Sequence, residues 1–185
     1  MNCLFIDKRI DYTGRQLRSH YIYEQFGVTG DAIIAFCGTC DVEREAMVDV
    51  EDVIAQNKIY SDAMLHFLVE HFNTDLERII LRQMLLATIV HDCLIHAHGS
   101  IVVIRKGSDL YDNDAKLSVS VATVSPVSAL IHFGINISSA HTPVITKGLE
   151  DYGIDPNQFA RTVMEQYSRD HDTVDRVRSK VRWVT

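Results

Sequence analysis

The sequence predicts a single α+β domain spanning residues 1–185, in which helices pack on a mostly antiparallel central sheet. Residues 116–123 and 129–137 each alternate between apolar and polar side chains and flank a turn signal at 125–128, which indicates an antiparallel hairpin. Residues 76–94 repeat apolar side chains at helical spacing, which indicates a core helix of about 20 residues. The chain has 185 residues, of which 46% are hydrophobic and 23% are charged, as expected for one globular domain with its own core.

The first sixty residues predict a strand, a helix, a second strand and an irregular segment. Residues 3–7 form a short apolar run, which predicts the opening strand. The capping-box pattern at 13–16 begins a helix that is expected to end at residues 26–27. The second strand is expected over residues 32–36. Residues 41–58 are polar and acidic, which predicts a loop with a short helix.

Residues 63–72 are ambiguous, because their near-continuous hydrophobicity suits either a buried strand or a helix. We favour a strand, since a second capping box at 74–77 starts the long helix immediately afterwards. In a strand, His66 and His71 lie on opposite faces, and His66 is interpreted as a hydrogen-bonded core residue rather than a ligand. After the long helix, residues 101–105 predict another strand.

The predicted hairpin has two different faces. Leu117, Val119 and Val121 are expected on the core side, together with the isoleucines and the phenylalanine of 129–137. The opposite face is expected to carry small and polar residues: Lys116, Ser118, Ser120, His132, Gly134 and Asn136. Such a face is either plain solvent surface or the floor of a ligand site. After the hairpin, Asp155-Pro156 begins a helical tail that continues as a charged amphipathic stretch over 172–182.

Composition limits the partners of the chain. The 25 acidic residues outnumber the 18 Lys and Arg residues and give a formal net charge of −7, which argues against a protein held on nucleic acid or on an anionic membrane by bulk charge. The charged residues directly after the amino-terminal apolar run do not fit a signal peptide, and we identify no apolar run of about 18 residues that would span a membrane. The four cysteines do not form a secreted disulfide scaffold, so the sequence predicts a cytoplasmic protein with reduced thiols.

Lys116 is the strongest candidate for a functional side chain. A lysine on the small-residue face of a central hairpin can place its ammonium group over a pocket, with Arg105 and Lys106 just upstream in the sequence. Fixed positive charge of this kind suits a carboxylate, a phosphate or a mixed acyl-phosphate anhydride. The alternative is that Lys116 opens a strand in solvent and has no ligand.

Residues 105–137 resemble the core motif of the biotin and lipoate protein ligase superfamily. In that superfamily an Asn-Asp-Leu strand leads through a turn to Lys-Leu-Ser-Gly, and a strand containing His-Gly follows. Residues 108–110 (S-D-L), 116–118 (K-L-S) and 132–135 (H-F-G-I) match these pieces. The order of the preceding elements also suits that fold. The whole chain more closely resembles the prokaryotic family known as domain of unknown function 366, which looks like a compact relative of those ligases and carries no established activity.

The resemblance implies an enzyme that binds a small carboxylate or its adenylate, with ATP and Mg²⁺ as cofactors. Lys116 is implied to contact the carboxylate and the phosphate of the acyl-adenylate, and Asp109 to lie near the adenylate or a metal. Substrate-binding residues are expected among Arg105, Lys106, Asp109, Ser118, Ser120, His132, Gly134 and Asn136.

Two alternatives to an enzyme remain open. Val119 stands where the superfamily has a glycine, and residues 38–62 contain neither the glycine-arginine loop of biotin ligases nor the triple glycine of lipoate ligases. A binding module that keeps the pocket for a small anion but lacks ATP chemistry would fit these departures. In a purely structural protein, a partner or a second copy of the chain, as in a homodimer, would cover the hairpin face.

Other residues form weaker candidate sites. Cys37 and Cys40 form a C-x-x-C pair, and Cys93 with His96 or His98 would complete a tetrahedral zinc site only if the fold brings them together. A second interpretation is that these are ordinary thiols. The acidic cluster Asp49, Glu51 and Asp52 is either solvated surface or a magnesium site. Serine hydrolase, P-loop and Rossmann functions are excluded, because their motifs are absent from the sequence.

Overall fold

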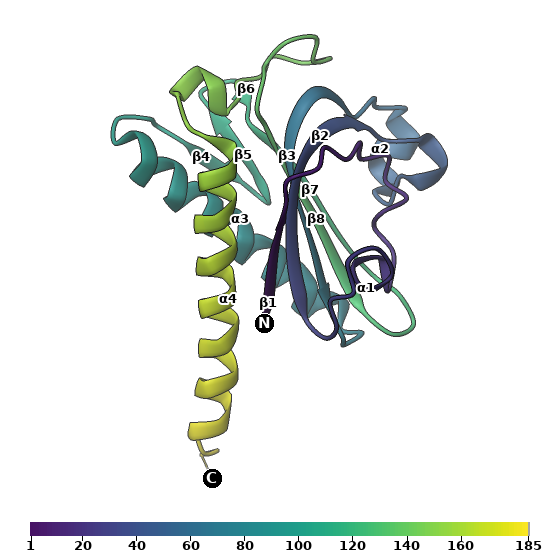
Figure 1. Cartoon of the computed structure of the whole chain (residues 1–185), viewed down its shortest axis with the longest axis vertical. Helices are drawn as coiled ribbons and strands as arrows, with labels where there is room; N and C mark the ends of the chain where they lie inside the picture. The colour runs from purple at the N-terminus through teal and green to yellow at the C-terminus, as the bar shows by residue number, and fades with distance from the viewer. Residues whose placement is uncertain (185) are drawn as a thin grey trace.

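The computed structural model describes residues 1–184 and contains a five-stranded main sheet with the order β1-β2-β3-β8-β7 (Figure 1). Only β1 and β2 run parallel, and every other neighbouring pair is antiparallel, as the sequence predicts. The strands are β1 (Asn2–Ile6), β2 (Ala32–Asp41), β3 (Tyr60–His71), β7 (Ser118–Val124) and β8 (Ala129–Asn136). The preference for a strand over 63–72 is therefore confirmed.

Two long helices, α3 (Leu76–His98) and α4 (Pro156–Lys180), cover one face of the main sheet (Figure 1). The short helices α1 (Tyr21–Phe26), η1 (Arg44–Ala46) and α2 (Val50–Ala55) lie on the other side, whereas η2 (Leu149–Tyr152) packs on the cluster under the long helices. Asp155 caps α4 as expected, by accepting a hydrogen bond from the Gln158 amide at 2.7 Å. The cap of α3 is Asp75 rather than Thr74, because the Asp75 carboxylate accepts from the Arg78 amide at 2.9 Å.

Two predicted elements are shorter than the sequence suggests. The first helix begins at Tyr21, not at residue 13, because Gln16 accepts a hydrogen bond from the Thr13 amide within a local turn that does not continue as α-helix. The strand expected over 101–105 begins only at Ile104. It belongs to a small second sheet formed by β4 (Ile104–Lys106), β5 (Asp109–Asp112) and β6 (Ala115–Lys116).

The sequence predicts that the polar residues of both hairpin strands lie on one face, and for β7 this prediction is wrong. Ser118 lies opposite Ile135 and Ser120 opposite Phe133, so both serines lie on the helix-covered side. Val119 and Val121 instead lie beside Gly134 and His132. The physical reason is a break at the buried Leu117, which separates β6 from β7 and shifts the alternation by one residue.

The buried side chains form two clusters, one on each face of the main sheet. The helix-covered face packs α3 and α4 on fully buried residues such as Leu65, Phe67 and Phe133. The other face is centred on Tyr12, Phe36 and Met64 and is closed by α1 and irregular segments. Helix α3 is long and apolar enough to cross a membrane by length and composition alone, and its buried face packs on the sheet here.

Candidate functional site

A cavity of about 620 Å³ opens on the face of the sheet that α3 and α4 leave free. Its floor comes from β3, β7 and β8, and its walls come from the segment around α2, from β5 and β6, and from residues 142–146. The polar residues that line it are Tyr12, Asp49, Asp52, Gln56, Asn57, Lys58, Tyr60, Ser108, Asp109, Lys116, Ser118, Ser120, His132, Asn136, Thr142 and Thr146. A volume of this size suits a small-molecule ligand, for which protein pockets measure about 300–1,000 Å³.

The ion pair between Lys116 and Asp109 is the strongest charged feature of this cavity. The Lys116 Nζ atom lies 2.6 Å from Asp109 Oδ2, and both side chains are largely buried. Burial lowers the pKa of Lys116, but the hydrogen bond and charge of Asp109 outweigh that effect and raise the pKa overall. Burial raises the pKa of Asp109, and Lys116 opposes that shift only in part. The ammonium therefore keeps its charge at neutral pH and has two N–H donors beyond the one that Asp109 accepts.

The backbone around Lys116 is fixed by three neighbouring segments. The Lys116 amide donates to the Ile145 carbonyl at 2.9 Å, and the Asn136 side-chain amide donates to the Lys116 carbonyl at 3.4 Å. The buried Ser118 hydroxyl accepts from the Leu110 amide at 2.9 Å and so fastens β5 beside β7. Asn136 and Ser118 thus orient the lysine, and both also line the cavity, so their contact with a ligand stays a prediction.

His132 lies beneath the cavity in a stack of rings. Its imidazole stacks on Tyr12 with 3.7 Å between ring centroids and shares a hydrogen bond of 3.0 Å with Nδ1 of His66. Burial lowers the pKa of His132 well below its ordinary value and lowers that of His66 to about 3, so both rings are neutral at neutral pH. His66 is a hydrogen-bonded core residue, as predicted.

The other four residues of the predicted site differ in their relation to the cavity. Arg105 and Lys106 are exposed on β4 and do not line the cavity; Lys106 lies over the Tyr111 ring at 4.8 Å. Ser120 lines the cavity, but its hydroxyl donates to the His132 carbonyl and accepts from Gln83 of α3, so the hydroxyl itself points to the helix side. Gly134 lies directly beneath the Met64 side chain, which lines the cavity, since a Cβ at Gly134 would lie 2.2 Å from the Met64 sulfur.

The segment around α2 supplies the wall that the sequence did not identify. Lys58 lies 4.3 Å from the centre of the Tyr60 ring, and Asn57 donates to Asp52 at 2.8 Å. The three acidic residues proposed as a magnesium site do not converge: Asp49 caps α2 by accepting from the Glu51 amide at 2.8 Å, and Glu51 is exposed outside the cavity. The polar composition of 41–58 was the only signal for this wall.

The condition for a zinc site at the cysteines is not met among the described residues, because the fold separates Cys37, Cys40 and Cys93. Cys40 is buried in the cluster on the cavity face, whereas Cys37 packs against the cluster under the helices. The β-bulge between Gly38 and Cys40 does not bring the two thiols to one face. Cys93 and His96 line a separate groove of about 770 Å³ between α3 and α4.

Comparison with known proteins assigns the chain to a family. The family described as Domain of unknown function (DUF366) matches residues 1–182. An uncharacterized protein of Methanocaldococcus jannaschii is 37% identical, with 95% of this chain and 82% of that protein aligned.

Solved structures with a similar fold include one of high and two of low sequence identity to this chain. A protein of unknown function from Pyrococcus horikoshi has a TM-score of 0.94 at 39% identity, covering 100% of this chain and 99% of that one. The biotin protein ligase of Aquifex aeolicus has a TM-score of 0.61 at 15% identity, covering 93% and 69%. LipL1 of P. falciparum, in complex with lipoate, has a TM-score of 0.58 at 13% identity, covering 100% and 64%. The chain therefore belongs to the DUF366 family, and its α+β fold is similar to that of biotin and lipoate protein ligases.

Proposed function

We propose that the cavity binds a small carboxylate or its adenylate, with Lys116 as the electrostatic anchor. The observation that carries this proposal is the Lys116–Asp109 ion pair on the wall of a 620 Å³ cavity. Asp109 fixes the ammonium in place, and the remaining N–H donors are free to meet ligand oxygens. The structural similarity to ligases that bind biotin or lipoate supports a carboxylate as ligand, by analogy of fold.

The charges of the cavity set the conditions for a nucleotide. Asp49, Asp52 and Asp109 line the same cavity as Lys58 and Lys116, so a bare triphosphate meets three carboxylates and two ammonium groups. ATP is therefore expected to enter with Mg²⁺, which offsets the negative charge of the phosphates.

As an enzyme, the protein would form an acyl-adenylate. A carboxylate oxygen of the acid attacks the α-phosphorus of ATP, the bond between the α- and β-phosphates breaks, and pyrophosphate leaves. Lys116 would stabilise the negative charge that develops on the α-phosphate oxygens, and for that reason we assign it the catalytic role.

A non-catalytic module on the same fold is the second candidate. Val119 faces the cavity side next to Gly134 and occupies space on the floor where a ligase would have a glycine. In this alternative the anion still binds at Lys116, but no ATP is consumed.

A thermal-shift screen with biotin, lipoate and octanoate, each with and without Mg²⁺-ATP, tests the proposal. We expect at least one acid to raise the Tm of the wild type and to have no effect on Lys116→Gln, which retains a hydrogen-bond donor beside Asp109. Lys147→Gln is the matched control, since Lys147 pairs with Asp112 at 2.6 Å outside the cavity.

The outcomes separate the candidates. Pyrophosphate release that requires the acid and is lost in Lys116→Gln supports the enzyme, and binding without pyrophosphate release supports the module. The absence of any shift with all three acids, or equal shifts in Lys116→Gln and wild type, would contradict both.

A further inference from the structure

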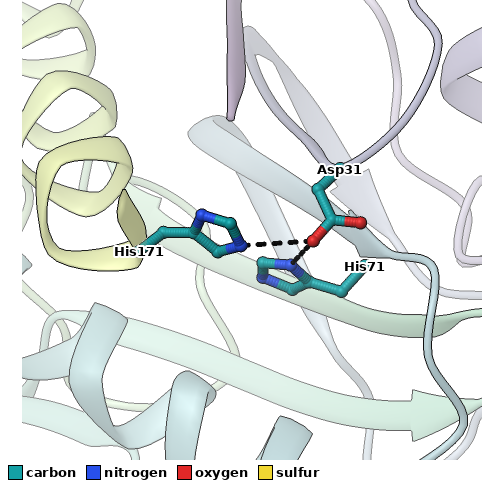
Figure 2. A group of neighbouring side chains, drawn as sticks. All are labelled: Asp31, His71 and His171. Carbon is teal, nitrogen blue, oxygen red and sulfur yellow. Dashed lines mark hydrogen bonds and ion pairs between the residues drawn. The ribbon is translucent and has the colours of Figure 1, made fainter. Parts of the chain in front are cut away.

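A second group of polar side chains lies on the opposite face of the sheet, far in sequence from Lys116. Asp31 precedes β2, His71 ends β3, and His171 lies in the last part of α4 (Figure 2). Both imidazoles turn a nitrogen toward the same carboxylate oxygen: His71 Nδ1 is 2.8 Å from Asp31 Oδ2, and His171 Nε2 is 3.2 Å from it. We propose that Asp31, His71 and His171 form a binding site for a first-row transition-metal ion such as Zn²⁺.

The donor set and its spacing fit such an ion. One carboxylate oxygen and two imidazole nitrogens, all within 4.8 Å of one another, are ligands for zinc and for the other late divalent metals. Two donors bound tetrahedrally at about 2.0–2.1 Å from zinc lie about 3.3 Å apart. The Asp31–His171 distance of 3.2 Å is already close to this value, and the Asp31–His71 distance of 2.8 Å needs to open by about half an ångström. The two imidazole nitrogens lie within 4.8 Å of each other and need to approach by up to about 1.5 Å.

Each proposed ligand is oriented by a hydrogen bond at its other polar atom. His71 Nε2 lies 3.0 Å from the Tyr167 hydroxyl, and His171 Nδ1 lies 3.3 Å from Asp172 Oδ1. The second oxygen of Asp31 accepts from the Phe72 amide at 2.8 Å. Metal-ligating histidines almost always donate their remaining N–H to such a partner, and these partners tune affinity by 10–100-fold.

The Tyr167 hydroxyl allows His71 to change tautomer when the ion binds. Without an ion, Nδ1–H of His71 donates to the Asp31 carboxylate, and Nε2 accepts from the tyrosine. With an ion on Nδ1, the proton moves to Nε2 and is donated to the phenol oxygen, which can accept as well as donate. The hydrogen bond between His71 and Tyr167 is kept with donor and acceptor reversed, and the hydroxyl hydrogen of Tyr167 turns away from the imidazole.

The site is reachable and would hold α4 to the sheet. His71 is fully buried, whereas the Asp31 side chain is 30% exposed and His171 is 11% exposed, so an ion and its water ligands can approach from the Asp31 side. The three ligands come from two strand ends and from the helix that extends beyond the sheet (Figure 1). An ion would therefore crosslink the carboxyl-terminal part of α4 to the sheet.

Calorimetric titration of Zn²⁺ into the full chain, stripped of metal with EDTA and tagged at the carboxyl terminus, tests this site. The tag is placed there because the Met1 amine pairs with Asp172 at 3.2 Å. We expect one ion per chain, with affinity at least tenfold weaker in Asp31→Asn and in His171→Gln. Tyr167→Phe keeps all three ligands and is expected to weaken binding about tenfold.

His141→Gln serves as the control, because His141 forms an exposed pair with Asp62 at 2.6 Å and lies outside the site. Co²⁺ supplies a second readout: the visible absorption of the bound ion should be present in wild type and His141→Gln and lost in Asp31→Asn. The site is refuted if wild type takes up no Zn²⁺ saturably, or if Asp31→Asn and His171→Gln both bind within twofold of wild type.

Discussion

The two faces of the main sheet are built from different kinds of residue. Under α3 and α4 the strands present an apolar layer of leucine, isoleucine, valine and phenylalanine, interrupted near its edge by His71. On the other face the same strands bury His66, Glu70, His132 and Asn136 under irregular segments. Polar groups that are buried must be hydrogen-bonded, and they specify a geometry more narrowly than apolar packing does. One face therefore contributes mainly apolar packing, and the other carries the buried polar groups beside the cavity for which we propose a ligand.

The largest expected difference between the faces is in stability. Phe133→Ala removes a fully buried ring from the helix-covered face and should lower the free energy of unfolding by about 3–5 kcal/mol, because it leaves a cavity. Val121→Ala, at the partly exposed cavity face of β7, should cost about 1 kcal/mol. Urea denaturation measures both losses. Similar losses for the two variants would show that the faces do not differ in this way.

The buried histidine pair should make the cavity face sensitive to acid. Folding depresses the pKa values of His66 and His132, so the unfolded chain binds more protons below its own histidine pKa of about 6.5. The contribution of these two histidines to the free energy of unfolding is therefore fully present above that pH, and it is lost as the pH drops toward their pKa values in the folded state. Between pH 7 and 5.5 we expect a loss of about 1 kcal/mol for each histidine.

The double variant His66→Asn with His132→Gln removes these two titrations and leaves every carboxylate in place. We expect the free energy of unfolding of this variant, measured in urea, to fall between pH 7 and pH 5.5 by about 2 kcal/mol less than that of wild type. An equal pH dependence in the two proteins would mean that these rings do not stay neutral in the folded state.

The smallest expected effect concerns the helix cap on the apolar face. Asp155→Ala removes the acceptor for the Gln158 amide at the start of α4 and should cost about 1 kcal/mol. Asp155→Asn keeps a capping oxygen and should stay close to wild type. The midpoint of urea denaturation compares the two, and a loss in Asp155→Asn as large as in Asp155→Ala would rule out capping as the cause.

The apolar face was largely predictable from the sequence, because regular alternation and helical spacing report directly on which side chains are buried. Strand β8 is uninterrupted, and its residues lie on the faces that its alternation predicts. The same reasoning failed for Ser118 and Ser120, because the break at Leu117 changes the alternation without a glycine or proline to mark it.

The sites depend on contacts that no local pattern encodes. Lys116 and Asp109 are close in sequence, and the ligase-like motif drew attention to both. The cavity wall at Asp52, Asn57 and Lys58 comes from an irregular segment without periodicity. Asp31 and His171 are separated by 140 positions, and only the docking of α4 on the sheet brings them together.

The central claim is that Lys116 receives the anionic group of a ligand in the cavity. Nuclear magnetic resonance of the protein labelled with ¹³C-lysine, titrated with the acids of the thermal-shift screen, tests this contact directly. We predict that the Lys116 side-chain signal shifts saturably, while the signal of Lys147, held by Asp112 outside the cavity, does not move. A ligand that saturates the protein and leaves the Lys116 signal unchanged, or the absence of any saturable shift with all of the acids, would contradict the claim.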